Sequence, residues 1–302
     1  MSGTGAARSG VVDYNIPMRI GINTPVLTRV PGAHSAWERD ADIEDIARIA
    51  EVADGLGFHH LTCSEHVAVP SAVAAQRGGT YWDPLATFGF LAARTRQIRL
   101  TTQVLVLGYH HPLAIAKRYG TLDRVSGGRL ILGLGVGSLE EEFDLLGAHF
   151  RDRGARADDA IAALRAAWGE SVPEYHGDFY DFAGFLVEPH ALQEHVPMWI
   201  GGRTRRSLRR AATHGDGWVP FGLSLDELEV LLRAVELPDH FDVVLTAGRP
   251  LDPGGDPGDS EKRLRRVSDA GATVVTAHIR ADSATHYCEQ LEALAGISTL
   301  LG

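Results

Sequence analysis

The chain has 302 residues, of which 44% are hydrophobic and 23% are charged, so it can bury a sizeable core. Its 29 basic and 39 acidic residues give a formal net charge of −10, which argues against nucleic acid or an anionic membrane as the main partner. No apolar stretch approaches the roughly 20 residues that span a bilayer. Two cysteines are too few for a disulfide framework or a four-cysteine zinc site. We therefore expect a globular, cytoplasmic protein.

Short β-rich runs and longer helical patterns alternate along the chain. The predicted strands cover residues 18–23, 60–63, 98–107, 130–134, 198–200, 217–219, 241–246 and 273–277. The predicted helices cover residues 42–56, 83–94, 112–125, 155–168, 204–214, 225–234, 261–270 and 284–295. Eight strand–helix units without a linker favour a (β/α)8 TIM barrel over an open doubly wound sheet.

Three segments stand outside this rhythm. Residues 1–17 contain one Arg and no apolar run, so we expect a flexible tail rather than a signal peptide, and a single domain over residues 18–302. Residues 176–188 carry alternating aromatic side chains, which predict a β-hairpin inserted after the fourth strand. Residues 248–259 are rich in Pro, Gly and Asp and predict a mobile surface loop.

Barrel enzymes place their active sites at the carboxyl ends of the strands. After the second predicted strand come Ser64, Glu65 and His66, and a carboxylate beside an imidazole can transfer protons near neutral pH. The alternative is a helix cap or a loop hydrogen bond, but the position at a strand end favours catalysis. His59 and His60 begin the same strand and are assigned to the opposite, structural end of the barrel.

Two further strand ends carry polar or glycine-rich segments. After the third strand, His110 and His111 are neighbours whose side chains diverge, so we expect one at the pocket and one capping the next helix, with no metal site. After the fourth, alternating glycines at Gly133, Gly135 and Gly137 would let a flat ring approach the backbone. Their spacing fits neither the dinucleotide fingerprint nor a P-loop. The acidic residues 140–142 are interpreted as a first helical turn.

After the fifth strand, Gly201 and Gly202 enter a helix that begins with three arginines, Arg203, Arg205 and Arg206. Free backbone N–H groups and the positive end of the helix dipole would meet there, which predicts a binding site for the phosphate of a cofactor or substrate. The alternative is a surface helix that is basic by chance. The cluster is one loop wide, too small for nucleic acid.

Several motifs, in one order, resemble the bacterial-luciferase-like superfamily, and most of all its branch of oxidoreductases that use the deazaflavin coenzyme F420. They are SEH at 64–66, HPL at 111–113, TLD at 121–123, SGGR at 126–129, the glycine strand 132–137 with LEEEF at 139–143, HGDFY at 176–180, WIGG at 199–202 and HGDGW at 214–218. They span residues 18–220, and the match beyond is loose.

The resemblance implies roles for individual residues. His66 would be the general acid or base at the reactive edge of the ring, with Glu65 positioning it. Ser64, Val136, Gly137 and Ser138 would lie at the cofactor, Thr102, Gln103 and Val104 would back its ring, often through a cis peptide bulge, and Gly201, Gly202 and Arg203 would hold its phosphate. The loops 64–82, 137–153 and 220–224 would choose the substrate.

Two departures from the family pattern bear on the reaction. Relatives commonly have Arg in place of His110, and an aromatic residue or Glu in place of Ser138. That Glu is a proton donor in members that oxidise a sugar phosphate, so this activity is not expected here.

The resemblance therefore implies hydride transfer between coenzyme F420 and a small organic substrate, by a homodimer to which apolar residues of the second and third helices would contribute. The first alternative is an FMN-dependent monooxygenase. The second is a flavin- or deazaflavin-binding protein without turnover. A metal-dependent barrel isomerase or hydrolase is less favoured.

Overall fold

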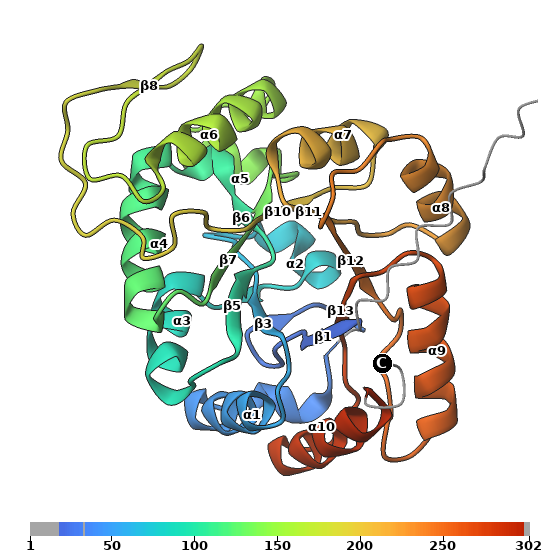
Figure 1. Ribbon diagram of the computed structural model, residues 1–302. Coiled ribbons are helices and arrows are strands. Elements are labelled where there is room, and N and C mark those ends of the chain that lie inside the picture. The colour runs from blue at the N-terminus through green and yellow to red at the C-terminus, as the bar shows by residue number, and fades with distance from the viewer. Residues whose placement is uncertain (1–17, 33, 299–302) are drawn as a thin grey trace, which may run out of the picture.

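Eight parallel strands form a closed barrel in the computed structural model, which describes residues 18–32 and 34–298 (Figure 1). In chain order they are β1 (Arg19–Ile22), β3 (His60–Cys63), β5 (Arg99–Thr102), β7 (Leu130–Gly135), β10 (Met198–Gly201), β11 (Gly217–Val219), β12 (Asp242–Thr246) and β13 (Val274–Ala277). Each strand pairs with the next one in this series, and β13 pairs with β1. The predicted (β/α)8 barrel is confirmed. The predicted tail, residues 1–17, lies outside the described residues.

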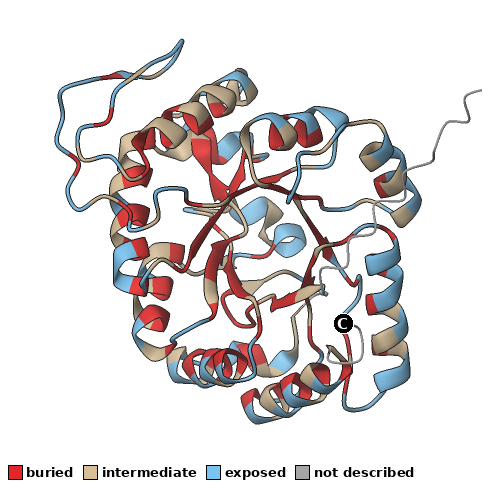
Figure 2. Ribbon diagram, viewed as in Figure 1, coloured by how far each residue is buried: buried red, intermediate tan, exposed pale blue. Residues whose placement is uncertain are grey.

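The outer layer consists of helices that follow the strands. They are α1 (Ile43–Gly55), α3 (Pro84–Arg94), α4 (Pro112–Ser126), α6 (Arg153–Ala167), α7 (Arg205–His214), α8 (Leu225–Arg233), α9 (Pro257–Asp269) and α10 (Ala284–Ser298). Figure 2 shows the strands almost wholly buried and the outer helix faces exposed. No described helix is long and apolar enough to cross a membrane.

Short strands and helices follow the carboxyl-terminal ends of several barrel strands. They are the antiparallel pair β2 (Thr28–Arg29) and β4 (Thr80–Tyr81), the 3-10 turns η1 (Ala36–Arg39) and η2 (Leu107–Tyr109), the strand β6 (Leu105–Val106), and the helices α2 (Ser71–Arg77) and α5 (Glu140–Leu145). Such short elements carry too few residues for a periodic signal, and α2 and the β2–β4 pair were not predicted.

The predicted hairpin is present as β8 (Tyr175–His176) and β9 (Asp181–Phe182), which follow α6. The Asp159 carboxylate of α6 accepts hydrogen bonds from the Tyr175 hydroxyl and from the backbone amide of Phe179. The predicted loop over residues 248–259 is wrong in two respects. Helix α9 already begins at Pro257, capped by Asp256, and Leu251 is fully buried in a bridge to Ile279.

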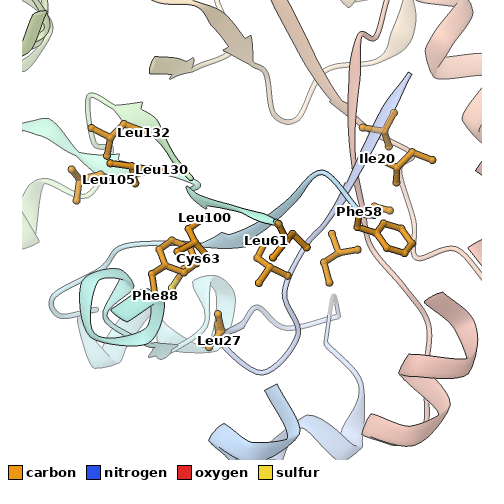
Figure 3. Packing of buried hydrophobic residues seen from close by; sticks show 14 of the residues in the cluster. Ile20, Leu27, Phe58, Leu61, Cys63, Phe88, Leu100, Leu105, Leu130 and Leu132 are labelled. Atoms are coloured by element: carbon orange, nitrogen blue, oxygen red, sulfur yellow. The ribbon is translucent and has the colours of Figure 1, made fainter. Parts of the chain in front are cut away.

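The hydrophobic core lies between the strands and the helices. Cys63 of β3 and Leu100 of β5 point toward Phe88 of α3 (Figure 3), and all three are buried. Burial raises the pKa of the Cys63 thiol, so this cysteine stays protonated and acts as an apolar core residue.

A histidine pair lies at the amino-terminal end of β3. His60 is fully buried, with Nε2 3.0 Å from the Thr276 hydroxyl and Nδ1 3.0 Å from Nδ1 of His59. The Trp199 ring stacks on His59 and meets His60 edge-on. A Cβ on Gly21 would lie 2.1 Å from Nδ1 of His60, so β1 requires glycine there.

The histidine pair should make stability depend on pH. Burial, reinforced by the charge of Arg19, lowers the pKa of His59 to about 3, and burial lowers the pKa of His60 well below its ordinary value. The unfolded chain binds protons on both as the pH falls below about 6.5, and the folded chain does not. The free energy of unfolding should therefore fall with decreasing pH, by up to about 1.4 kcal/mol per pH unit for each proton.

Urea denaturation at a series of pH values from neutral to about 5 measures this slope. His59→Phe keeps an aromatic ring on Trp199 and should show a shallower slope. Equal slopes in the two proteins would contradict the assignment.

The close approach of β1 to His60 predicts that Gly21→Ala destabilises the fold by about 1–3 kcal/mol or more, because the buried imidazole has no room to move. Gly89→Ala is the matched control. Gly89 lies within α3, and a methyl group added there would meet no other part of the chain within 4 Å, so alanine should stabilise by about 0.5–1 kcal/mol. Thermal or urea unfolding measures both, and an unaffected Gly21→Ala protein would refute the packing argument.

Candidate functional site

A cavity of about 640 Å³ opens at the carboxyl ends of the barrel strands. Each of the eight strands contributes a lining residue at or just beyond its end: Asn23, Ser64, Gln103, Gly135, Gly201, Val219, Thr246 and His278. The segments above the strands add Glu38, Tyr81, Tyr109 and Phe221, among others, and helix α10 adds Tyr287. This is the end of the barrel at which the sequence predicts the site.

Most of the predicted site residues line this cavity. They are Ser64, Glu65, His66, Gln103, Val104, Val136, Gly137, Ser138, Gly201 and Gly202. Thr102 does not line it, because its buried hydroxyl donates to the Gly133 carbonyl oxygen at 2.8 Å. Arg203 is exposed and lies outside the cavity, with its guanidinium carbon 6.0 Å from the ring centre of Phe221, which does line it.

His66 is held by a carboxylate that the sequence did not assign to it. Its Nδ1 lies 2.6 Å from an oxygen of Glu142, and its ring meets Tyr81 edge-on at 4.6 Å. An ionised carboxylate only accepts hydrogen bonds, so Nδ1 carries the proton. No hydrogen bond within the described chain engages Nε2, which is left as the proton-accepting nitrogen of the neutral ring.

Glu142 is 1% exposed and uses both oxygens fully. One accepts hydrogen bonds from the backbone amides of Val67 and Ala68, and the other accepts from His66 and from the Tyr109 hydroxyl. Burial alone would raise the pKa of Glu142, but the hydrogen bonds from Tyr109, Ala68 and His66 together hold it below its ordinary value. Burial and the neighbouring carboxylate raise the pKa of Tyr109, so its hydroxyl stays a donor.

Glu65 does not position His66, contrary to the expectation from the sequence. One of its oxygens lies 2.6 Å from Nε2 of His110, and the other accepts the backbone amide of Val106 at 2.7 Å. Two separate carboxylate–histidine pairs thus lie at this end of β3, His66–Glu142 and His110–Glu65. Glu65 and His66 are neighbours in the sequence, which suggested that they act together. Because the side chains of adjacent residues diverge, each has a different partner.

The signal for Glu142 was present in the sequence. Leu139 and Phe143 are four residues apart and both are buried, which defines the inward face of this turn. Glu142 lies on that face, whereas Glu140 and Glu141 are exposed. The three acids do form the first turn of α5, as predicted, but the prediction gave Glu142 no role in the site.

The backbone bulges inward after β5. The Gln103–Val104 peptide bond is cis, as the resemblance implies, and the Ser64 hydroxyl donates to the Gln103 carbonyl oxygen at 2.7 Å. The alternating glycines of β7 make room for this bulge. A Cβ on Gly133 would lie 1.9 Å from the Thr102 carbonyl oxygen, and one on Gly135 would lie 2.5 Å from the Val104 side chain. The face expected to be open to a flat ring is therefore partly filled by the protein.

The entrance of α7 is less open than expected. The Gly202 amide is not free, because it donates to the Val219 carbonyl oxygen at 3.3 Å. Gly202 also has φ +145°, and a Cβ there would lie 2.4 Å from Ser207. The amides of Arg205 and Arg206, in the first turn of α7, have no acceptor among the described residues. These amides and the exposed Arg203 side chain are the groups available to an anion.

Of the two adjacent histidines after β5, one has its predicted role and the other does not line the cavity as expected. His111 caps α4, with its Nδ1 accepting the Leu113 amide, as predicted. Neither His110 nor His111 lines the cavity, and Tyr109 does so instead. At the mouth, Arg77 of α2 donates to the Ser138 hydroxyl at 3.2 Å. No group of three metal-ligating side chains occurs among the described residues.

The chain is similar in sequence to known proteins. A family model described as luciferase-like monooxygenase matches residues 18–245. An uncharacterized protein of Mycobacterium tuberculosis is 30% identical over 200 residues, which cover 62% of this chain and 69% of that protein.

Solved structures share the fold over nearly the whole chain. Monooxygenase RslO1 from Streptomyces bottropensis superimposes with a TM-score of 0.75 at 23% identity, covering 92% of this chain and 98% of that chain. An F420-dependent secondary alcohol dehydrogenase in complex with an F420–acetone adduct has a TM-score of 0.70 at 13% identity, covering 93% and 98%. A type II Baeyer-Villiger monooxygenase from Pseudomonas putida in complex with FMN has a TM-score of 0.65 at 16% identity, covering 92% and 96%. At these identities the likeness shows the fold alone.

The contacts of Glu142 predict that Glu142→Gln reverses the tautomer of His66. The amides of Val67 and Ala68 require an oxygen, so the new NH₂ group must face Nδ1 of His66 and donate to it. The ring proton then moves to Nε2. NMR of protein labelled at the histidine nitrogens distinguishes the two neutral tautomers.

Tyr109→Phe is the matched control for this change. It removes the other donor to the same carboxylate oxygen and should leave the proton on Nδ1. Finding the proton on Nδ1 in the Glu142→Gln protein as well would contradict the proposed pairing.

Proposed function

Because the chain belongs to the luciferase-like monooxygenase family, we propose that it is an oxidoreductase that transfers a hydride between coenzyme F420 and a small organic substrate. The observation that carries this proposal is the His66–Glu142 pair in the wall of the cavity. Interconversion of an alcohol and a carbonyl moves one proton with each hydride, and His66 supplies a group for that proton. The fold is shared with an F420-dependent alcohol dehydrogenase, which supports the proposal as an analogy.

The cavity fits a flat, polar ring. The side-chain oxygen of Gln103 is buried and has no hydrogen-bond partner among the described residues, yet Gln103 lines the cavity. A buried acceptor of this kind calls for a donor, and the pyrimidine edge of a deazaflavin or flavin carries N–H groups. We assign the ring to Ser64, Gln103, Val104, Val136, Gly137 and Ser138, and the phosphate to Gly201, Gly202 and Arg203, with Thr102 supporting the bulge from behind.

When bound, the deazaflavin would accept or supply the hydride. The chain's own contribution is orientation and proton transfer. With Nδ1 fixed on Glu142, Nε2 of His66 accepts the proton of a substrate hydroxyl as hydride leaves the carbon, and returns it in the reverse direction. Glu65 is a positioning residue that ties His110 and the Val106 amide to the bulge.

The FMN-dependent monooxygenase remains the second candidate. Two proteins of this fold are monooxygenases, one of them in complex with FMN. The unpartnered Gln103 oxygen and the α7 entrance serve an FMN ring and phosphate equally well. The two candidates differ in the cofactor and in the need for oxygen.

We also propose that the chain works in the cytoplasm as a homodimer. Exposed apolar side chains support a second copy as partner, among them Val125 of α4 and Phe185 and Leu186 beyond β9. Val125 belongs to the third predicted helix, and the contribution of the second stays a prediction.

Titration of the purified protein with F420 and, in parallel, with FMN tests the cofactor. We expect F420 to bind much more tightly than FMN, with reduction of bound F420 across a panel of secondary alcohols. His66→Ala and Glu142→Gln should keep F420 binding and lose about 10²–10⁴-fold in turnover, because each removes the proton acceptor at Nε2.

Each other outcome selects a different function. Tighter binding of FMN favours the oxygen-dependent monooxygenase, and F420 binding without redox change across the panel favours a binding protein without turnover. Full turnover by His66→Ala refutes its role in proton transfer. If neither cofactor binds, the oxidoreductase proposal falls.

A further inference from the structure

The β1, β12 and β13 side of the cavity carries polar residues that the proposed function leaves without a role. Asn23 follows β1, Thr246 ends β12 and His278 follows β13, and these strands are neighbours in the sheet. Thr246 is in register with Thr276, and the Asn23 amide donates to the Ala277 carbonyl oxygen. The three residues therefore lie along one side of the cavity, which we call the polar wall.

The polar wall has unused hydrogen-bonding capacity. Within the described residues, no hydrogen bond engages the Thr246 hydroxyl or either ring nitrogen of His278. The side-chain oxygen of Asn23 accepts one long bond, 3.4 Å, from Thr62. By contrast, Glu65 and His66, which line the cavity beyond β3, are paired at 2.6 Å with His110 and Glu142. Polar side chains that line a cavity without protein partners are available to a ligand.

The charges around the cavity limit what that ligand can be. No Lys or Arg is among the described lining residues, so the lining offers an anion no permanent positive charge. The lining carboxylates are already used, Glu38 by the amides of Val26 and Ser35 and Glu65 by Val106 and His110. Burial lowers the pKa of His278, which keeps its ring neutral. Because Glu38 and Glu65 are both occupied, a cation finds no free carboxylate in the lining either.

We propose that the polar wall is the substrate-recognition site and that it selects neutral molecules bearing a hydroxyl or carbonyl oxygen, against carboxylates and phosphates. A neutral imidazole offers one donor and one acceptor, and a threonine hydroxyl offers both, which suits a hydroxyl group. Val30, Val219, Phe221 and Ile279 line the same cavity and give the rest of the molecule an apolar surface. The inference rests on the proposed function only in taking this cavity as the reaction site.

Three probes with one skeleton test the selection: benzyl alcohol, benzoate and benzylamine. Each is titrated into the full-length protein labelled at the histidine nitrogens, with the His278 signal identified from its loss in His278→Phe. We expect benzyl alcohol to shift the His278 signal saturably and to bind about tenfold or more tightly than either charged probe. His278→Phe and Thr246→Val should each weaken binding of benzyl alcohol by about 3–10-fold, the effect of losing one hydrogen bond, as followed by calorimetry.

Thr285→Val is the matched control, since Thr285 is exposed on α10 outside the cavity, and it should bind benzyl alcohol like the unchanged protein. Benzoate or benzylamine binding as tightly as the alcohol, no saturable binding of the alcohol, or binding unaffected by both wall variants would each overturn the proposal. F420 titrated into the same variants separates the two hypotheses. If the unchanged protein does not bind F420 while benzyl alcohol binding still depends on the wall, the F420-dependent function alone falls. If F420 binds and both wall variants bind benzyl alcohol normally, the substrate site alone falls.

Discussion

The buried carboxylate of Glu142 is the constraint on which the rest of the site depends. It receives four hydrogen bonds, three from the segment after β3 (His66 and the amides of Val67 and Ala68) and one from Tyr109 of η2. Together with its own helix α5, it joins three segments that are far apart in the chain. A buried charge is tolerated only when its oxygens are satisfied, and here the donors that satisfy it also fix the imidazole. The same hydrogen bonds therefore stabilise these segments and fix the tautomer of His66, and a change to Glu142 affects both.

Regular elements were predictable from the sequence because their signals are local. Alternating β-rich and helical patterns located the barrel strands and outer helices, and Asp83 with Pro84 marked the start of α3. Contacts between loops were not predictable in the same way. His66 and Glu142 lie 76 positions apart and meet only because the ends of β3 and β7 converge on one cavity. Glu65, its neighbour in sequence, was the natural but wrong choice as partner for His66.

The alternating glycines of β7 were predicted to leave room for a flat ring, but they leave room for another part of the chain. Gly133 and Gly135 do leave a strand face without side chains, as predicted, but the bulge after β5 occupies the space, with the Thr102 carbonyl and the Val104 side chain against them. Only the three-dimensional pairing of β5, β6 and β7 reveals this. The glycines thus allow the bulge that carries Gln103 and Val104 into the cavity.

Charge is distributed unequally between the rim and the interior of the cavity. Three arginines lie at the α7 entrance in a chain of net charge −10, whereas no described lining residue is Lys or Arg. An anionic cofactor tail can therefore be attracted at the rim, where water screens the charges, while the interior offers neutral donors and acceptors. The outer part of the cavity therefore suits an anionic group and the inner part a neutral one, because only the outer part carries arginine side chains.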